Sequence, residues 1–160
     1  MIEQNISLKK YNTFGIDARA QYFSVFNAAD QLAELLEFKK SPTSNLQPPT
    51  LILGGGSNIL LTKDFNGLVI KNEIPGIEKI KEDDACVFIK VGAGVNWHQL
   101  VLHCIDNNWA GVENLSLIPG NVGASPMQNV GAYGVEIKDV FYELEAFHLT
   151  EKKNYYVWDK

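Results

Sequence analysis

The first residues suited to chemistry are five small ones that follow the apolar run 50–53. They are Gly54, Gly55, Gly56, Ser57 and Asn58. Consecutive glycines let a backbone present several N–H groups to one anion, and serine and asparagine add side-chain donors. We therefore interpret residues 54–58 as a candidate phosphate- or pyrophosphate-binding loop. An ordinary turn is the alternative.

The common phosphate motifs do not fit this loop. The Gly-Lys-Ser/Thr of nucleoside triphosphatases is absent, because the apolar run 59–61 follows. The dinucleotide fingerprint of doubly wound folds needs a third glycine, which neither the GxG at 54–56 nor that at 92–94 has in the required place. Nothing here is placed to hold a γ-phosphate and its magnesium ion.

A second candidate is the uncharged segment 117–134, LIPGNVGASPMQNVGAYG. Small residues, backbone donors and amide side chains suit a flat, partly apolar, hydrogen-bonding ligand better than an ion. A surface loop is the alternative. Because Ile118, Val122 and Val130 would be unusual in an exposed loop, we expect a buried, ligand-facing one.

Other chemistries find little support, and we expect neither a catalytic residue nor a metal site. No nucleophile elbow, HExxH or CxxC is present. His98 and His103 lack a second ligand at metal spacing, so we expect solvated or rim positions rather than zinc ligation. Glu113 lies in an apolar, glycine-flanked run, where a structural, hydrogen-bonded role is favoured over a catalytic one. We expect Cys86 and Cys104 to be reduced core residues.

Composition restricts the partners. The 160 residues fit one domain or two small lobes, and 14 Lys+Arg against 19 Asp+Glu give a net charge of −5. This balance argues against a nucleic-acid binder or a polybasic membrane-surface protein. No run approaches the roughly 18 apolar residues of a membrane span. We therefore expect a cytoplasmic protein with no nucleic-acid or membrane partner, and a monomer.

The first half of the chain predicts a strand, a helix and a strand. The strand covers 21–26, and the helix runs from about 28 to 39 with Asn27 as its N-cap. The apolar run 50–53 is typical of a buried strand. This order indicates a parallel unit.

The second half predicts a helix among hairpins. The helix covers about 96–106, capped by Asn96 with Gln99 completing a capping box, and its apolar stripe ends at Ile105. The remaining short strands are expected at 68–70, 77–81, 86–91, 140–149 and 154–157.

Four segments, in order, carry a family resemblance. They are Asn12-Thr13-Phe14-Gly15, LILGGGSNIL at 51–60, VGAGVNWHQLV at 91–101 and ENLSLIPGNVGASPMQNVGAYGVEI at 113–137. Together they closely resemble the UDP-N-acetylenolpyruvoylglucosamine reductases, flavoenzymes of bacterial peptidoglycan synthesis. The resemblance covers nearly the whole chain.

The resemblance implies an α+β fold. It is the two-lobed FAD-binding domain of the vanillyl-alcohol-oxidase (PCMH) type, with FAD between the lobes; the first lobe would be 1–72 and the second 73–160. Carried over by position, residues 54–58 would bind the FAD pyrophosphate. The residues implied to line the isoalloxazine and ribityl region are Ile118, Pro119, Gly120, Ala124, Ser125, Gly131 and Tyr133. Some family members have serine at the position of Ala124, so a side-chain hydrogen bond to the flavin is expected to be absent here.

The implied reaction transfers a hydride from NADPH through FAD to the enolpyruvyl double bond of a small UDP-sugar, UDP-N-acetylglucosamine enolpyruvate, and gives UDP-N-acetylmuramate. The family assigns catalysis to an arginine in an FGYR-type motif, a glutamate and a serine. None of those motifs is present, and Arg19 is the only arginine. We therefore expect a truncated chain without the substrate-binding domain, inactive alone. A stand-alone flavin- or nucleotide-binding module and a flavin oxidase of the same fold are the alternatives.

Overall fold

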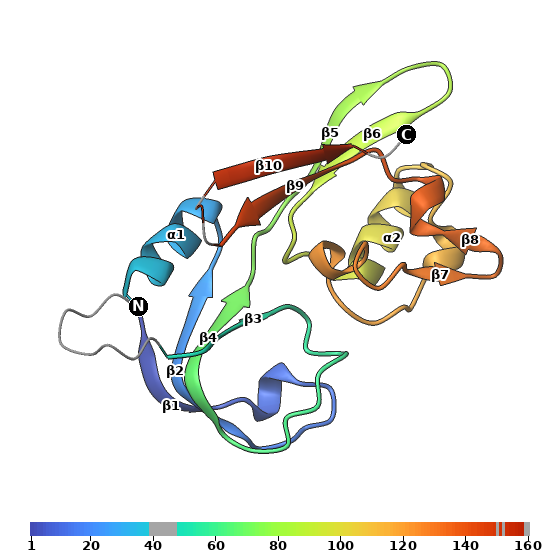
Figure 1. Cartoon of the computed structure of the whole chain (residues 1–160). Coiled ribbons are helices and arrows are strands. Elements are labelled where there is room, and N and C mark those ends of the chain that lie inside the picture. Colours follow the sequence, from blue (N-terminus) through green and yellow to red (C-terminus); the bar gives the residue numbers. More distant parts are fainter. Residues whose placement is uncertain (39–47, 150, 152, 159–160) are drawn as a thin grey trace. The chain divides into compact units, whose positions relative to one another are not determined.

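The computed structural model describes residues 1–38, 48–149, 151 and 153–158. The chain divides into two compact units, Met1–Glu73 and Ile74–Lys160 (Figure 1). The sequence predicts a division between residues 72 and 73, one position earlier. Helices mixed with parallel and antiparallel strands confirm the α+β class.

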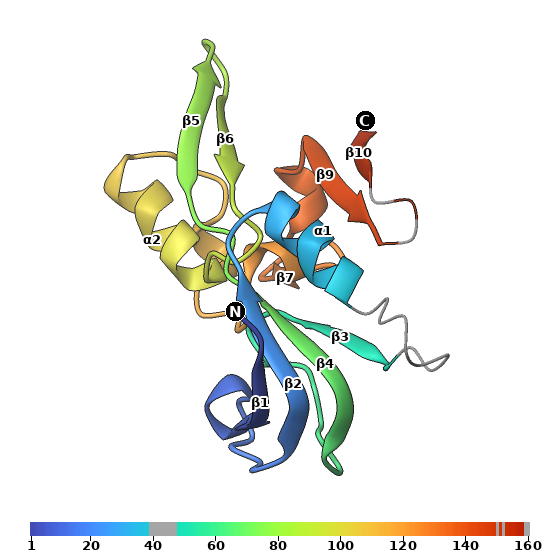
Figure 2. The same ribbon diagram turned by 90° about the vertical axis from the view of Figure 1, so that its left-hand side faces the viewer.

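The described part of the first unit is built around a four-stranded sheet in the order β1-β2-β4-β3 (Figure 2). Its strands are β1 (Glu3–Ser7), β2 (Arg19–Phe26), β3 (Thr50–Leu53) and β4 (Phe65–Asn72). Both β2 and β3 run parallel to β4, whereas β1 is antiparallel to β2. Helix α1 (Ala29–Phe38) follows β2. The predicted parallel unit is therefore confirmed, with β4 between its two strands.

Helix α1 does not use Asn27 as its cap. The Ala28 carbonyl accepts the first helical hydrogen bond, from the Leu32 N–H at 3.4 Å, so Ala28 occupies the cap position. The Asn27 N–H donates to Oε1 of Gln31 at 2.8 Å. The predicted cap is wrong by one position, because Gln31 in the first turn reaches back to the residue before the cap. The predicted helix end, Lys39, lies outside the described residues.

One apolar cluster ties the N-terminal segment to the sheet of the first unit. Its buried members are Leu8, Ala18, Ala20, Phe23, Leu53, Leu61 and Val69. The 3₁₀ helix η1 (Lys9–Tyr11) ends with Tyr11, whose ring stacks on Phe23 with centroids 4.7 Å apart. The chain around residues 8–18 is therefore packed against the sheet that also carries β3.

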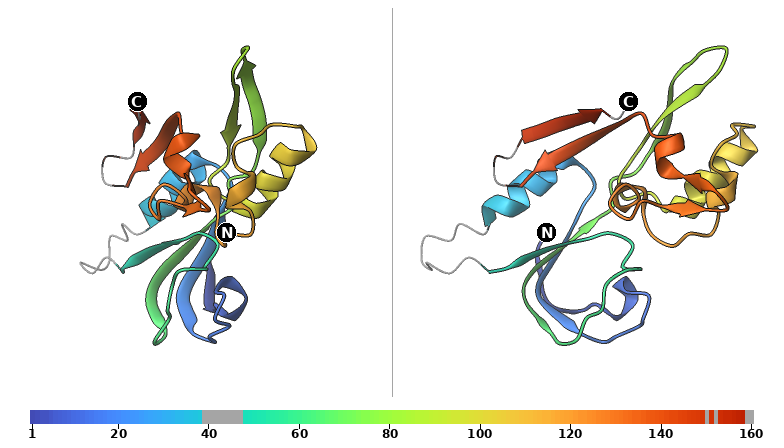
Figure 3. Two further views of the ribbon diagram at one scale, coloured as in Figure 1. Left: turned by 90° about the vertical axis from the view of Figure 1, so that its right-hand side faces the viewer. Right: turned by 45° about the vertical axis from the view of Figure 1, so that its right-hand side comes forward.

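The described part of the second unit combines antiparallel strand pairs with one α-helix (Figure 3). The pairs are β5 (Ile77–Glu82) with β6 (Val87–Val91), β7 (Gly131–Ala132) with β8 (Val135–Glu136), and β9 (Glu143–His148) with β10 (Lys153–Trp158). Three short 3₁₀ helices are η2 (Glu113–Leu115), η3 (Val122–Ala124) and η4 (Ile137–Asp139). The sequence predicts the β5–β6 and β9–β10 hairpins with slightly different bounds. It does not predict the β7–β8 hairpin.

Helix α2 (Trp97–Asp106) follows the predicted pattern closely. Oδ1 of Asn96 accepts the Gln99 N–H at 3.2 Å, which confirms the cap. The residues that α2 buries in the second core are Trp97, Leu100, Val101 and Cys104. Ile105, expected to end the apolar stripe, is about half exposed.

The two cysteines differ in environment. Cys104 is buried, as predicted, and burial raises the pKa of its thiol, with the Glu113 carboxylate adding to the effect. Cys86 is exposed, so its predicted core position is wrong. Its N–H donates to Oδ1 of Asp83 at 2.8 Å, which places it in the β5–β6 turn before the partly buried residues of β6 begin.

Candidate cofactor-binding loops

Residues 54–58 lie directly after the carboxyl end of β3. Ligands of sheets with parallel strands usually bind at this end, because the loops that leave the strands gather there. Gly55 and Asn58 are exposed, Gly54 and Ser57 are half-buried, and Gly56 is buried. The loop therefore turns an accessible stretch of backbone outward and keeps one glycine inside the unit.

Gly56 is held against the N-terminal segment. Its φ is +69°, and a Cβ built on it would overlap the carbonyl oxygen of Tyr11. Its own carbonyl accepts two hydrogen bonds from Thr13, from the N–H at 3.0 Å and from Oγ1 at 3.1 Å. Only glycine fits here without moving the backbone, so this contact fixes the conformation of the loop.

Asn12 organises the segment that makes this contact. Its side chain is only 7% exposed. Its Nδ2 donates to the carbonyls of Leu8 at 2.8 Å and Ile16 at 2.9 Å, and its Oδ1 accepts the Ile16 N–H at 3.0 Å. Both amide protons and the amide oxygen are thus used, as a buried polar side chain requires. The asparagine supports Thr13 and, through Thr13, the glycine loop.

The glycine loop keeps its own donors uncommitted. Within the described residues, the backbone N–H groups of Gly55, Gly56 and Ser57 make no hydrogen bond, and neither do the side chains of Ser57 and Asn58. Neighbouring N–H groups on a loop of fixed conformation suit an anion with several oxygens. The geometry therefore fits a phosphate or pyrophosphate, as the sequence predicts.

The second candidate loop pairs with the segment 91–96. The N–H groups of Val122 and Gly123 donate to the carbonyls of Val95 at 2.9 Å and Ala93 at 3.0 Å. The buried Asn121 donates from Nδ2 to the Gly94 carbonyl at 2.9 Å. These bonds join the chain before α2 to the middle of segment 117–134.

Gly123 is required by this pairing. A Cβ built on it would lie 2.6 Å from the Cβ of Ala93, which is far closer than two non-bonded carbon atoms approach in proteins. Any side chain at position 123 would therefore push the two segments apart.

Ser125 faces inward. It is 2% exposed, and its Oγ donates to the Val122 carbonyl at 2.7 Å, while its own carbonyl accepts the Val130 N–H at 3.2 Å. Its hydroxyl therefore stabilises the turn after η3. Of the other residues that the resemblance implies, Ile118, Gly120 and Ala124 are half-buried and Pro119 and Gly131 are exposed.

The expectation of a buried loop is wrong for its large side chains. Leu117 is 76% exposed, and Met127 and Tyr133 are each 89% exposed. Burial is confined to Asn121, Ser125 and Val130. The predicted pattern fails because the loop's small and amide residues make the inward contacts, which leaves its larger apolar residues outside.

Two of the exposed residues have a costly backbone conformation. Leu117 and Tyr133 have φ values of +62° and +53°, in the left-handed region where a side chain costs about 1–2 kcal/mol relative to glycine. Tyr133 and Gly134, with φ +82°, form the two-residue connection of the β7–β8 hairpin, and both positive φ values match a type I′ turn. Backbone strain of this kind is concentrated at functional sites. In this loop it occurs at residues whose apolar side chains are exposed.

Glu113 has the structural role that the sequence predicts. Its Oε2 accepts the Gly111 N–H at 2.6 Å. Hydrogen bonds from its own backbone N–H and from that of Gly111 hold the pKa of this carboxyl below its usual value. Among the described residues, no group of histidine, cysteine and acidic side chains could hold a metal ion, and no helix is long and apolar enough to cross a membrane.

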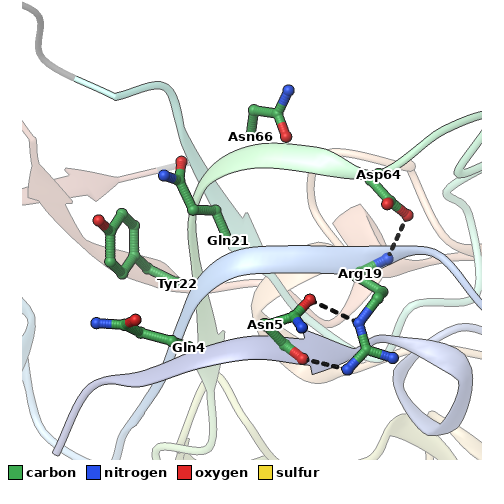
Figure 4. A pocket seen from close by; sticks show the side chains of 7 residues that line it. All are labelled: Gln4, Asn5, Arg19, Gln21, Tyr22, Asp64 and Asn66. Atoms are coloured by element: carbon green, nitrogen blue, oxygen red, sulfur yellow. Dashed lines mark hydrogen bonds between the residues drawn. The ribbon is translucent and has the colours of Figure 1, made fainter.

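A separate concavity lies on the sheet of the first unit (Figure 4). Its volume is about 550 Å³, and its lining residues are Gln4, Asn5, Arg19, Gln21, Tyr22, Asp64 and Asn66. Arg19 is already hydrogen-bonded within this concavity. Its side-chain Nε donates to Oδ1 of Asn5 at 2.6 Å, and its backbone N–H donates to the carboxylate of Asp64 at 2.8 Å. The concavity contains no residue of either candidate loop, and sequence reasoning did not identify it.

Comparison with known proteins assigns the family. The family model described as FAD binding domain matches residues 23–150. The chain belongs to this FAD binding domain family. The matched span contains both candidate loops, and FAD is the cofactor of the family.

The curated relatives of this FAD-binding domain are named UDP-N-acetylenolpyruvoylglucosamine reductase. The protein from Amoebophilus asiaticus is 53% identical over 149 residues, which are 93% of this chain and 43% of the relative. The one from Flavobacterium johnsoniae is 50% identical over 152 residues, 95% of this chain and 43% of the relative. The chain thus spans less than half the length of the curated relatives it matches.

A solved structure shows the same fold. The UDP-N-acetylenolpyruvylglucosamine reductase from Thermus caldophilus matches with a TM-score of 0.71 and 23% identity, over 99% of this chain and 52% of that one. The fold of the FAD-binding domain is therefore that of the corresponding part of this reductase.

Proposed function

We propose that the chain is the FAD-binding portion of a UDP-N-acetylenolpyruvoylglucosamine reductase. Residues 54–58 hold the pyrophosphate of FAD through their backbone N–H groups and the side chains of Ser57 and Asn58. The residues that line the isoalloxazine and ribityl region are Ile118, Pro119, Gly120, Ala124, Ser125, Gly131 and Tyr133. Ser125 contributes by fixing the turn, because its hydroxyl, its backbone N–H and its carbonyl are all bonded within the loop.

The uncommitted N–H groups of Gly55, Gly56 and Ser57 are the observation that carries this proposal. Thr13 and Asn12 already fix the loop, so these donors need little reorganisation to meet an anion. The second loop supports it by presenting Tyr133 and Leu117, whose apolar surfaces suit a flat ring system.

The whole protein would reduce UDP-N-acetylglucosamine enolpyruvate to UDP-N-acetylmuramate with NADPH, a step of peptidoglycan synthesis. FAD supplies the hydride-transfer chemistry when it is bound. The residues of this chain bind and orient it, and we assign no proton transfer to any of them. The relatives' names support this activity. We further propose that the protein is cytoplasmic and monomeric and that its partner is a small UDP-sugar. The net charge of −5 argues against nucleic-acid and membrane partners.

Replacement of Gly55 by aspartate tests the pyrophosphate role. Gly55 is exposed and has no positive φ, so its backbone conformation is open to other residues, and aspartate places a carboxylate beside the proposed anion. Titration with FAD and with riboflavin, which carries no phosphate, separates the two loops. We expect FAD binding to weaken at least about tenfold and riboflavin binding to change by less than about twofold.

Asn66→Asp is the matched control. It adds the same charge to an exposed residue near the amino end of β4, the opposite end of the sheet from the loop because β3 and β4 are parallel. It should leave both affinities unchanged. Equal FAD affinities for wild type and Gly55→Asp would exclude the pyrophosphate role, and a folded wild type that binds no flavin would exclude the function.

A further inference from the structure

The first turn of α2 touches the start of the second loop through a histidine. Nδ1 of the half-buried His98 lies 3.1 Å from Oγ of Ser116 and 3.3 Å from the backbone nitrogen of Leu117. The sequence predicts a solvated or rim position for His98. The structure instead places its ring nitrogen at the residue that opens segment 117–134.

The direction of these hydrogen bonds follows from the groups involved. A backbone N–H can only donate, so Nδ1 of His98 must accept the bond from Leu117. The ring is therefore neutral, with its proton on Nε2, and the Ser116 hydroxyl can share the same acceptor. A protonated ring has N–H groups at both nitrogens and no acceptor, so protonation would leave the Leu117 N–H without this partner.

Leu117 is a residue for which such a partner matters. Its φ of +62° is unfavourable for leucine, and its side chain is largely exposed, so local packing does little to hold it. Ser116 before it is fixed by its N–H, which donates to the Glu113 carbonyl at 3.2 Å. The His98 contact therefore falls where the chain leaves a fixed turn and enters the loop.

The neighbouring residue of α2 holds the other end of the same stretch. The Trp97 N–H donates to the Gly120 carbonyl at 3.0 Å, and its ring Nε1 donates to the Leu115 carbonyl at 2.7 Å. Two adjacent side chains and one backbone N–H of α2 thus hold residues 115–120 at three points. Between these points lie Ile118 and Pro119, which we propose contact the flavin.

We propose that His98 is a positioning residue for flavin binding: its neutral ring fixes Leu117 and thereby presents residues 118–120 to FAD. This role rests on the proposed function. The other titratable groups on α2 are His103, Cys104 and Asp106, and η2, which packs against α2, contributes Glu113. Within the described residues none of these forms an ion pair with His98, and Glu113 is bonded to the Gly111 N–H.

Three variants test the role by FAD titration at about pH 8. His98→Ala removes the acceptor and should weaken FAD binding at least about fivefold at pH 8. His98→Asn places a carbonyl oxygen near the position of Nδ1 and should restore affinity to within about twofold at pH 8. His103→Ala is the matched control on the same helix, because that ring packs edge-on against Trp109 and should leave FAD affinity unchanged.

The asparagine variant distinguishes positioning from a purely structural role, because it restores the acceptor without restoring the ring. In FAD-free protein, the NMR resonance of the Leu117 amide should shift in His98→Ala, and in His98→Asn it should stay close to its wild-type position.

The outcomes separate this role from the proposed function. If the wild type binds FAD and His98→Ala binds it equally well, only the positioning role is overturned. Equal losses of FAD affinity in His98→Ala and His98→Asn, or a Leu117 amide resonance that is the same in His98→Ala and wild type, overturn it as well. A folded wild type that binds no FAD overturns the proposed function and this role together.

Discussion

Gly56 and Tyr11 share a space too small for a side chain, although 44 intervening residues separate them in sequence. The tyrosine's carbonyl oxygen occupies the position that a Cβ on Gly56 would take. This contact, with the two hydrogen bonds from Thr13, couples the N-terminal segment to the loop that we propose holds the pyrophosphate.

Gly56→Ala should therefore destabilise the fold by at least about 2 kcal/mol, since a positive φ and a backbone overlap act together. Urea unfolding measures the loss. Gly54→Ala is the matched control, because a Cβ there meets no atom within 4 Å and φ is not positive. It should change the free energy of unfolding by no more than about 0.5 kcal/mol. Similar losses in the two variants would contradict the packing argument.

Tyr133→Asn should make the protein more stable and worse at binding flavin. Asparagine tolerates the positive φ of the β7–β8 turn better than tyrosine, so we expect a gain of about 0.5–1 kcal/mol in the free energy of unfolding. The exposed ring is lost at the same time, so FAD affinity should fall. Tyr133→Phe keeps the ring and the strain, and should resemble wild type in both measurements. A variant that gains stability without losing affinity would remove Tyr133 from the flavin contacts.

Glu113 should contribute to stability at neutral pH and not in acid. Hydrogen bonds from its own N–H and that of Gly111 lower its pKa in the fold below the ordinary value of 4.5. The contribution is thus fully present above about pH 4.5 and is lost as the pH falls through the lowered folded pKa. Glu113→Gln should have a lower Tm than wild type at pH 7, and the two should converge near pH 3.

Glu78→Gln is the control for this pH effect. Glu78 is exposed on β5, and within the described part of the chain no hydrogen bond engages its side chain. Its Tm should follow that of wild type at every pH. A Tm difference for Glu113→Gln that persists unchanged in acid would mean that the carboxylate charge is not what stabilises the loop.

The sequence predicts correctly those helices and strands that are fixed by residues close to one another in the chain. Helix α2 is an example, because the Asn96 cap and the apolar stripe lie within a dozen residues of each other. The β5–β6 hairpin is another. Strand β1 was missed because its sequence EQNIS contains one apolar residue, and its pairing with β2 supplies what the pattern lacks. The glycine clusters also indicated which loops to inspect, although their ligand stays a prediction.

Long-range contacts account for what the sequence did not predict. Asn12 carries a weak signal, since it stands four residues from both Leu8 and Ile16, yet nothing local shows that its segment packs on Gly56. The role of His98 depends on Leu117, 19 positions away, and on a φ value that a leucine seldom adopts. Charge and hydropathy patterns contain neither fact, because both arise from tertiary packing.

Gly123 and Ala93 offer a direct test of the pairing that supports the second loop. Gly123→Ala should cost about 1–3 kcal/mol of stability and weaken FAD binding, because the new methyl group meets the Ala93 Cβ at 2.6 Å. In the double variant Ala93→Gly/Gly123→Ala the opposing methyl group is gone, so much of the loss should be recovered. The backbone of Ala93, at 3.0–3.1 Å, keeps the recovery incomplete. A double-mutant cycle in unfolding free energy and FAD affinity measures the coupling. Additive effects would show that positions 93 and 123 are not in contact, which would contradict the pairing of the two segments.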